Sequence, residues 1–467
     1  MSTNNSLDSS RDEDIEQVLF AKREKIFPRE VHGVFAALRI ASVLLLLGIF
    51  YGLPWLNWDG RQSILLDLPA RKFYVFGLTF WPQDFLYLTF LLIIAAMTLF
   101  FFTTLAGRLW CGYACPQTVW TETFLWIERL IEGDRNKQIR LEKSPWNLRK
   151  FRIKISKHSL WVVFSLFTGF SFVAYFTPAR DLTQQILNLS LGPWEAFWLF
   201  FYAFATYGNA GWMREQVCIY MCPYARFQSA MFDNDTLTVS YDKQRGEPSG
   251  PRRSNIDHKK NGLGDCINCT LCVQVCPTGI DIRDGLQYQC IGCSACIDAC
   301  DDVMDKMKYP KGLIRYTTQN ALQGKPTRVL RPRIVIYGLI LLTIFAIFSY
   351  SVLNRVPLGL DVIRDRNQLY RETAGLIENI YTLKVLNMDK QAHTYHLTVN
   401  GIEGLSIESD SDTIHVASGQ VQDYPVCLRV DESNLTERSS KIVFSLVAID
   451  TEDLSIEEHA RFLGPVQ

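Results

Sequence analysis

The sequence predicts a multi-pass α-helical membrane protein with five spans, a cytosolic dicluster ferredoxin-like α+β domain and a C-terminal β-sandwich. Three observations predict this fold: five apolar stretches near the length of about 20 residues that crosses a bilayer, eight of the 13 cysteines gathered within residues 266–300, and alternating apolar and polar residues after 353. The 48 basic and 48 acidic side chains cancel, but residues 355–467 carry a net charge of −8 and the rest of the chain carries +8. These two parts therefore face different surroundings.

The apolar stretches define the expected membrane topology. Spans are expected at residues 34–53, 85–105, 160–176, 194–211 and 334–353. The third and fourth are short or interrupted by glycine, so buried soluble helices remain an alternative for these two. Lys and Arg are more frequent in residues 14–33, 106–159 and 313–333 than in the alternate segments, which places the N-terminus in the cytosol and the C-terminus on the other side.

This topology divides the chain into five parts. They are a cytosolic N-terminal tail (1–33), four spans with two CxxxCP motifs (34–213), a cytosolic linker and 4Fe-4S ferredoxin-like domain (214–333), the fifth span (334–353) and an external domain (354–467). Residues 233–265 are rich in Lys, Arg, Gly and Asn, which indicates a solvated linker. Alternation at residues 380–386, 395–399, 426–430 and 442–447 predicts the short strands of a β-sandwich.

The strongest motif is a double ferredoxin run. The spacing Cys-x2-Cys-x2-Cys-x3-Cys occurs at residues 266–276 and again at 290–300, and the fourth Cys of each such motif binds the cluster of the other. The run predicts two 4Fe-4S clusters. The first is assigned to Cys266, Cys269, Cys272 and Cys300, and the second to Cys290, Cys293, Cys296 and Cys276. Paired zinc sites are the less favoured alternative.

A second cysteine motif occurs twice. Cys111-Gly-Tyr-Ala-Cys115-Pro116 and Cys218-Ile-Tyr-Met-Cys222-Pro223 both fall at the expected cytosolic face. Proline favours the first position of a helix, so Cys115 and Cys222 are expected at helix N-termini, where the pKa of a thiol is lowered and the thiolate can bind metal or transfer electrons. The alternative, buried cysteines packed as small apolar residues, explains poorly why the pattern occurs twice.

Other polar and ionisable groups give weaker predictions. His393 and His396 are three residues apart on an expected strand and point to opposite faces, which does not favour an external copper site. Cys427 is expected in the core. A basic segment at residues 135–157 is expected to bind anionic lipid or, as a less favoured alternative, an acidic electron donor. Its basic residues are Arg135, Lys137, Arg140, Lys143, Arg149, Lys150, Arg152, Lys154 and Lys157.

With these motifs in place, the sequence resembles the CcoG family, also called FixG or RdxA, whose members are accessory factors for assembly of cbb-type cytochrome c oxidase. The resemblance covers nearly the whole chain and includes residues 54–61 and 71–77. It implies a bacterial inner-membrane protein with a periplasmic immunoglobulin-like domain. It also implies reduction of Cu(II) to Cu(I). Because thiolates prefer Cu(I), we take four cysteines as the candidate catalytic and copper-binding residues: Cys111, Cys115, Cys218 and Cys222.

The resulting hypothesis is a cupric reductase. A cytosolic donor, not identified by the sequence, reduces the clusters, the clusters reduce copper, and Cu(I) passes to a copper transfer or oxidase assembly factor. Two alternatives stay open: a quinol-oxidising membrane ferredoxin that feeds a periplasmic reductase, and a non-redox scaffold for copper or oxidase subunits. Membrane lipid is a further expected partner, nucleic acid is not, and a homodimer is left open.

Overall fold

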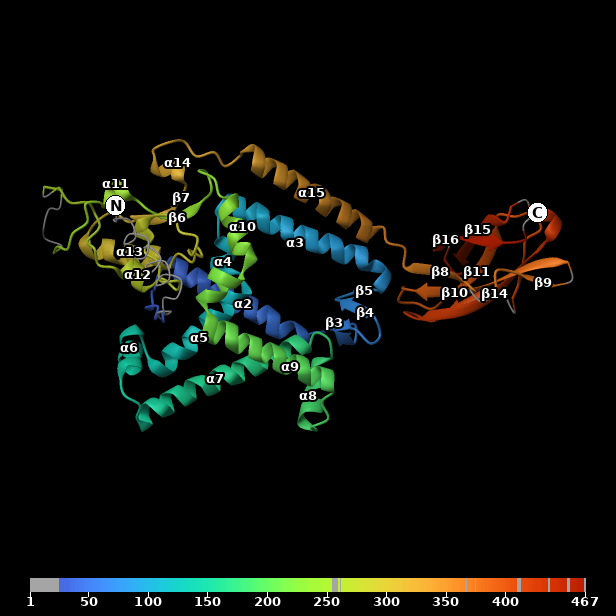
Figure 1. The fold of residues 1–467 in the computed structure, drawn as a ribbon, viewed down its shortest axis with the longest axis horizontal. Coiled ribbons are helices and arrows are strands. Elements are labelled where there is room, and N and C mark those ends of the chain that lie inside the picture. The colour runs from blue at the N-terminus through green and yellow to red at the C-terminus, as the bar shows by residue number, and fades with distance from the viewer. Residues whose placement is uncertain are drawn as a thin grey trace, which may run out of the picture. The chain divides into compact units, whose positions relative to one another are not determined.

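The computed structural model describes residues 25–467 apart from 254–258, 261, 366–367, 374, 410–412, 436, 452–453 and 466–467. The chain forms two compact units, Met1–Phe345 and Ala346–Gln467. The boundary between them falls within helix α15 (Pro332–Leu353) (Figure 1). The first unit holds a helical part and a cysteine-rich part, and the second unit is built from strands.

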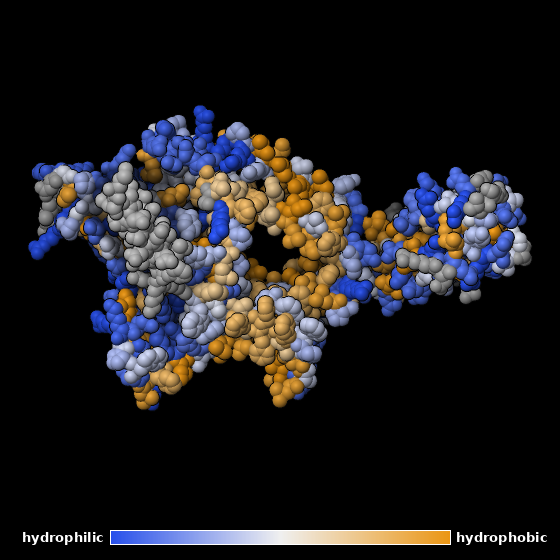
Figure 2. Space-filling view, in the orientation of Figure 1, coloured by the Kyte–Doolittle hydropathy of each residue, from blue (hydrophilic) through white to orange (hydrophobic). Residues whose placement is uncertain are grey.

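Three helices in the described part of the chain are long and apolar enough to cross a membrane. They are α2 (Val34–Gly52), α3 (Phe85–Ala106) and α15, and they match the first, second and fifth expected spans. Large apolar side chains on these helices are exposed, such as Leu45, Leu92 and Leu342. Figure 2 shows hydrophobic residues gathered over this part of the first unit. Their exposure is what a surrounding lipid phase requires.

The third and fourth expected spans fall in two helices that pack along each other. Helix α7 (Leu148–Val173) begins with a basic segment, and α9 (Pro193–Thr206) has only 14 residues before it continues as the π-helical segment η3 (Tyr207–Met213). Gly169 permits their close approach, because a Cβ there would lie 2.2 Å from the carbonyl oxygen of Leu199. Three of the five expected spans are thus found as long apolar helices, and the five-span count stays a prediction.

Shorter elements connect these helices. Helices α5 (Pro116–Glu132) and α10 (Pro223–Met231) begin at the two motif prolines, as expected. Between α2 and α3 the chain forms η1 (Leu53–Trp55), β1 (Asn57–Trp58), β2 (Arg61–Gln62), β3 (Ile64–Asp67), β4 (Lys72–Val75), β5 (Leu78–Phe80) and η2 (Pro82–Asp84). The other helices here are α4 (Leu109–Tyr113), α6 (Arg135–Lys143), α8 (Ala179–Leu187) and η4 (Val217–Met221).

The cysteine-rich part is a small α+β fold. Strand β6 (Thr238–Tyr241) pairs antiparallel with β7 (Ile314–Thr317), and α13 (Ala295–Met307) packs with them. The expectation of a solvated linker is wrong here, because Val239 and Tyr241 alternate into the apolar core. The remaining elements are α11 (Lys243–Gly246), α12 (Leu271–Gln274), η5 (Ile282–Asp284) and α14 (Gln319–Leu322).

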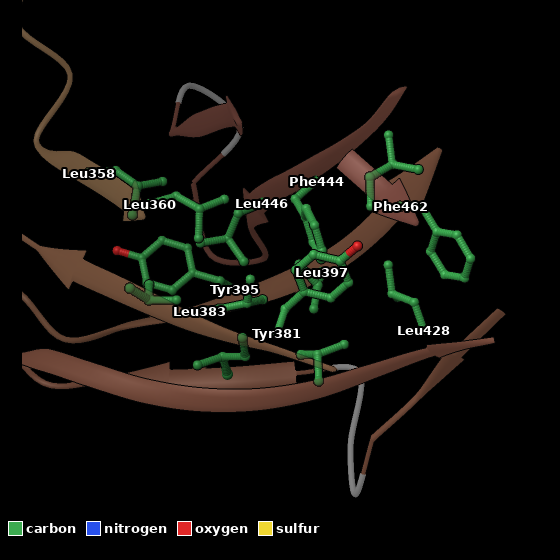
Figure 3. Packing of buried hydrophobic residues seen from close by; sticks show 14 of the residues in the cluster. Leu358, Leu360, Tyr381, Leu383, Tyr395, Leu397, Leu428, Phe444, Leu446 and Phe462 are labelled. Atoms are coloured by element: carbon green, nitrogen blue, oxygen red, sulfur yellow. The ribbon is translucent and has the colours of Figure 1, made fainter. Parts of the chain in front are cut away.

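The second unit is a β-sandwich, as predicted. One sheet has the order β12-β14-β10-β8 with β9 also paired to β10, the other has the order β13-β11-β15-β16, and all pairs are antiparallel. Buried side chains from both sheets meet between them (Figure 3). The ring centroids of Tyr381 and Phe444, for example, lie 5.3 Å apart. The strands are β8 (Leu358–Arg364), β9 (Arg371–Thr373), β10 (Leu376–Asn387), β11 (His393–Asn400), β12 (Ser406–Glu408), β13 (Thr413–Val416), β14 (Val421–Asp431), β15 (Ser439–Ala448) and β16 (Ser455–Leu463), with η6 (Glu432–Asn434) between β14 and β15.

Candidate metal centres

The first cysteine set surrounds one cavity of the cysteine-rich part. Its members Cys266, Cys269, Cys272 and Cys300 all line this cavity, as the spacing predicts. Asn268 and Thr270, on either side of Cys269, have left-handed backbone angles (φ 53° and 57°) that let the short loop curl around the cavity. The residue Cys269 is exposed. This set therefore has one thiol ligand near solvent.

The second cysteine set surrounds another cavity and is less exposed. Its members Cys276, Cys290, Cys293 and Cys296 line this cavity together with Cys272. Cys293 is buried between Gly292 and Ser294, both left-handed (φ 68° and 60°). Burial raises the pKa of Cys293 to about 12. Loading of a cluster must therefore displace protons from these thiols, which is the usual coupling of metal binding to protonation.

The thiol spacing distinguishes a cluster from a single metal ion. Four thiolates on one zinc ion, with Zn–S distances of about 2.3 Å, lie only about 3.8 Å from one another. Within the described ranges, three metal-ligating groups come within 4.8 Å of one another only at Glu378, Glu408 and Cys427, where Arg429 already binds both carboxylates. The two cysteine sets are more widely spaced around their cavities. Their residues therefore fit two 4Fe-4S clusters better than two zinc ions.

The two CxxxCP motifs come together in the helical part. Cys111 lies in α4, Cys115 precedes α5, Cys218 lies in η4 and Cys222 precedes α10. Burial raises the pKa of Cys111 to about 11 and of Cys218 to about 12, and the neighbouring thiols of the motifs add to both increases. These four residues, here called the four-cysteine group, therefore form one site from two distant segments.

The expected effect of the helix N-terminus on Cys115 is wrong. Burial raises the pKa of this thiol, although the backbone N–H groups of Gln117 and Thr118 act in the opposite direction. The cost of removing a thiolate from water outweighs the attraction of the helix terminus. Cys115 therefore keeps its proton near neutral pH until a metal replaces it.

The four-cysteine group lies directly against the second cysteine set. Cys111 packs against the apolar cluster that contains Cys293. At the next residue, a Cβ on Gly112 would lie 2.7 Å from the carbonyl oxygen of Gly292 and 3.0 Å from the Cα of Cys293. Glycine at position 112 therefore lets the two backbones touch. A cluster in the second set would be the one adjacent to the four-cysteine group.

Two buried arginines donate hydrogen bonds to the backbone of the second set. Arg39 of α2 donates a hydrogen bond to the carbonyl oxygen of Cys293 (3.1 Å). Arg108 donates to the carbonyl oxygens of Tyr288, of Cys290 (3.2 Å) and of Ala225 in α10 (2.6 Å). The sequence reasoning missed both residues. Its only available signal was position, since Arg108 stands three residues before Cys111 as Arg214 stands four before Cys218.

The second CxxxCP motif is held by a buried ion pair. Arg214 has a strained left-handed backbone (φ 44°) between η3 and η4, and its guanidinium contacts Glu128 of α5 (2.7 Å). Burial alone would raise the pKa of Glu128, but Arg214 and Lys157 hold it at about 2. The carboxylate is therefore charged at every physiological pH. It fixes the turn that leads to Cys218.

The basic segment 135–157 is only partly a surface. Lys150 and Lys157 are buried, and Lys154 pairs with Glu132 and Glu142 at 3.0 Å each. The exposed basic residues of the segment are Lys137, Arg140, Lys143, Arg149 and Arg152. Binding of lipid or of an acidic donor there stays a prediction with fewer available charges.

The sequence predicts no metal site in the second unit, and the positions of its histidines and its cysteine can be compared with that expectation. His393 is buried between Asp450 (2.8 Å) and Asp389 (3.0 Å), whereas His396 is exposed, so the two point to opposite faces as expected. Cys427 is half-buried on the outer side of β14, because Val426 and Leu428 take the core positions. The expectation of a core cysteine is therefore wrong.

Comparison with known proteins matches three segments of the chain to family models. Residues 213–319 match the model of a 4Fe-4S dicluster domain, residues 88–134 that of a 4Fe-4S binding domain, and residues 348–465 that of the IG-like fold at the C-terminus of FixG. The nitrogen fixation protein FixG of Rhizobium meliloti is 38% identical, over 92% of this chain and 91% of its own length. The chain belongs to the FixG/RdxA family.

Other members of the FixG/RdxA family are similar over less of the chain. Protein RdxA of Cereibacter sphaeroides is 41% identical, over 84% of this chain and 86% of its own. The crystal structure of a FixG-related protein from Vibrio parahaemolyticus is 40% identical over 24% of this chain and 98% of its own, with a TM-score of 0.22. Membership and the two 4Fe-4S domain matches identify an iron-sulfur electron-transfer protein of the oxidoreductase type.

Proposed function

We propose that this FixG/RdxA protein reduces Cu(II) to Cu(I) at the four-cysteine group for assembly of cbb-type cytochrome c oxidase. The observation that carries the proposal is the contact between that group and the second cysteine set, through Gly112 and Gly292. Soft thiolates favour Cu(I) over Cu(II), so binding there favours the reduced product. Each copper ion takes one electron.

Each step of the proposed reduction can be assigned to named residues of the chain. The two cysteine sets hold the clusters, which when bound supply single electrons. The thiols of the four-cysteine group hold copper against the second set, and Gln228 accepts a hydrogen bond from the Cys111 thiol (3.4 Å). Within the described residues, no three of the four thiols all lie within 4.8 Å of one another. We therefore expect two thiolates to bind each copper ion. Bound copper displaces their protons.

The membrane setting is part of the same proposal. Five spans, with α7 and the α9–η3 helix as the third and fourth, place both CxxxCP motifs and the clusters in the cytosol and the sandwich in the periplasm of a bacterial inner membrane. Exposed Trp146 and Phe151 beside the exposed arginines of the basic segment suit a lipid headgroup layer. The Cu(I) product then leaves to a transfer or assembly protein.

The test is anaerobic copper reduction by the chemically reduced full chain, followed with a Cu(I)-specific chelator. We expect the double variant Cys115→Ser/Cys222→Ser to keep its iron and to lose most Cu(I) affinity and reduction, because a hydroxyl is harder and less acidic than a thiol. Cys427→Ser, the same replacement outside every set, should match the parent. A double variant that reduces and binds copper like the parent contradicts the proposal.

One observation favours a second candidate for the same group. The match of residues 88–134 to a 4Fe-4S binding domain includes Cys111 and Cys115, and four thiols that converge are also the ligand number of a cluster. In this alternative the four-cysteine group holds a third cluster and the protein is an electron carrier. Iron analysis separates the two: about eight irons per chain support the copper site, and about twelve, falling to about eight in Cys115→Ser/Cys222→Ser, support the third cluster.

A further inference from the structure

Arg108 is a buried cation that has no acidic partner among the residues the structure describes. Its side chain is 8% exposed, and within the described part of the chain its guanidinium donates hydrogen bonds only to the backbone carbonyl oxygens of Tyr288, Cys290 and Ala225. Its Nε makes no hydrogen bond to any described residue. The other buried arginines nearby are different, because Arg39 contacts Glu122 at 3.7 Å and Arg214 contacts Glu128 at 2.7 Å. Within the described ranges, no carboxylate forms an ion pair with Arg108.

An uncompensated buried charge is strongly destabilising, and carbonyl dipoles offset only part of that cost. The acidic groups around Arg108 are thiols from both neighbouring sites. Burial raises the pKa values of Cys111, Cys218 and Cys290, and the charge of Arg108 opposes the rise at each of them. The guanidinium therefore lies within electrostatic reach of the second set and of the four-cysteine group.

We propose that Arg108 is the counter-ion of the cluster in the second set and couples that cluster to the four-cysteine group. A 4Fe-4S cluster held by four thiolates is a net anion, and it becomes more negative when reduced. An adjacent fixed cation therefore stabilises the reduced form and raises the reduction potential of that cluster. This inference rests on the cluster assignment of the proposed function and not on copper as the substrate.

Among the described residues, the cations beside the first set are half-buried rather than buried. Arg283 lines the cavity but contacts Asp281 at 2.6 Å, and Arg252 donates a hydrogen bond to the carbonyl oxygen of Cys266 (3.4 Å). Because solvent screens a half-buried charge more than a buried one, we expect the second cluster to have the higher potential of the two. Electrons that enter at the first set, near exposed Cys269, move downhill to the second set and to the four-cysteine group.

The experiment is a redox titration of the copper-free full chain, followed by low-temperature spin resonance. The second cluster is identified by its loss in Cys276→Ser. We expect Arg108→Gln to shift its midpoint to more negative values by at least a tenfold change in the reduced-to-oxidised ratio, about 59 mV for one electron. Arg108→Lys, which keeps the charge, should shift it less. The matched control Arg283→Gln should shift the first cluster and leave the second unchanged.

The counter-ion role is overturned if Arg108→Gln holds the parent's iron and its second cluster keeps the parent's midpoint. Where Arg108→Gln fails to load the second cluster, Arg108→Lys decides the question. A normal second cluster in Arg108→Lys supports the charge, whereas its loss there means that only the guanidinium hydrogen bonds matter and overturns the proposal. A parent chain without paired 4Fe-4S signals contradicts the proposed function itself, which is a different result.

Discussion

The β-sandwich and the cysteine-rich part differ in what completes their interiors. In the sandwich, side chains from both sheets fill the space, and Tyr381, Tyr395, Phe444 and Phe462 are fully buried (Figure 3). In the cysteine-rich part, eight thiols line two cavities beside a small apolar core. The sandwich is therefore stabilised by its own side chains, whereas we expect the cysteine-rich part to need its clusters for stability.

Buried charge follows the same contrast. In the sandwich, His393 lies between two carboxylates supplied by the same unit. In the first unit, Arg108 is buried without a described carboxylate and faces thiols instead. His393 is thus neutralised by protein residues, whereas we propose that a metal–thiolate centre neutralises Arg108.

The largest expected effect is loss of one cluster ligand. Cys276→Ser should remove the second cluster and, because Cys272 lines both cavities, weaken the first. We expect iron to fall to half or less, copper reduction to disappear and the cysteine-rich part to become sensitive to protease. The sandwich should resist protease as in the parent. Equal loss of protection in both parts would show that the sandwich also depends on the clusters for its stability.

A cavity in the sandwich should give the opposite result. Phe444→Ala removes a fully buried ring from between the sheets, which costs about 3–5 kcal/mol of unfolding free energy. We expect a lower denaturant midpoint for the sandwich, measured by pulse proteolysis of the full chain, with unchanged iron content. Loss of iron in this variant would show that the two parts are not independent in stability.

A smaller effect is expected where the four-cysteine group touches the second set. Gly112→Val puts a branched side chain against Gly292, and such overpacking costs about 1–3 kcal/mol. Because the contact must widen, copper reduction should slow while both clusters remain. Gly338→Ala, whose Cβ would meet only Phe101 at 3.4 Å, is the matched control. Parent-like copper reduction in Gly112→Val would mean that this contact does not transmit electrons.

The smallest effect concerns pH and the sandwich. Burial would lower the pKa of His393, but hydrogen bonds to Asp389 and Asp450 outweigh it and raise the pKa. The imidazolium therefore stabilises the sandwich below about pH 6.5, and this contribution is lost as pH rises through the raised pKa. The denaturant midpoint should fall between pH 5.5 and 8.5 in the parent, and less in His393→Gln. The same fall in both would assign it to other groups.

The sequence predicts these elements unequally, for physical reasons. Cluster ligands are predictable because a cubane requires cysteines at fixed short spacing, and the sandwich strands because apolar residues alternate. Strand β6 is missed because its four residues lie in a charged segment and pair with β7 far along the chain. The contact of Gly112 with Gly292 and the hydrogen bond from Arg108 to Cys290 depend on tertiary packing that no local pattern contains. The pKa of Cys115 is misjudged because its burial is equally non-local.

In the proposed mechanism, electrons leave the clusters for copper at the four-cysteine group. The most direct measurement mixes fully reduced, iron-loaded protein with one equivalent of Cu(II) under anaerobic conditions and follows cluster signals and Cu(I) together. We expect one cluster electron to be lost for each Cu(I) formed in the parent and in Cys427→Ser, and reduced clusters to persist in Cys115→Ser/Cys222→Ser. Equal rates of cluster oxidation in all three proteins would contradict the account.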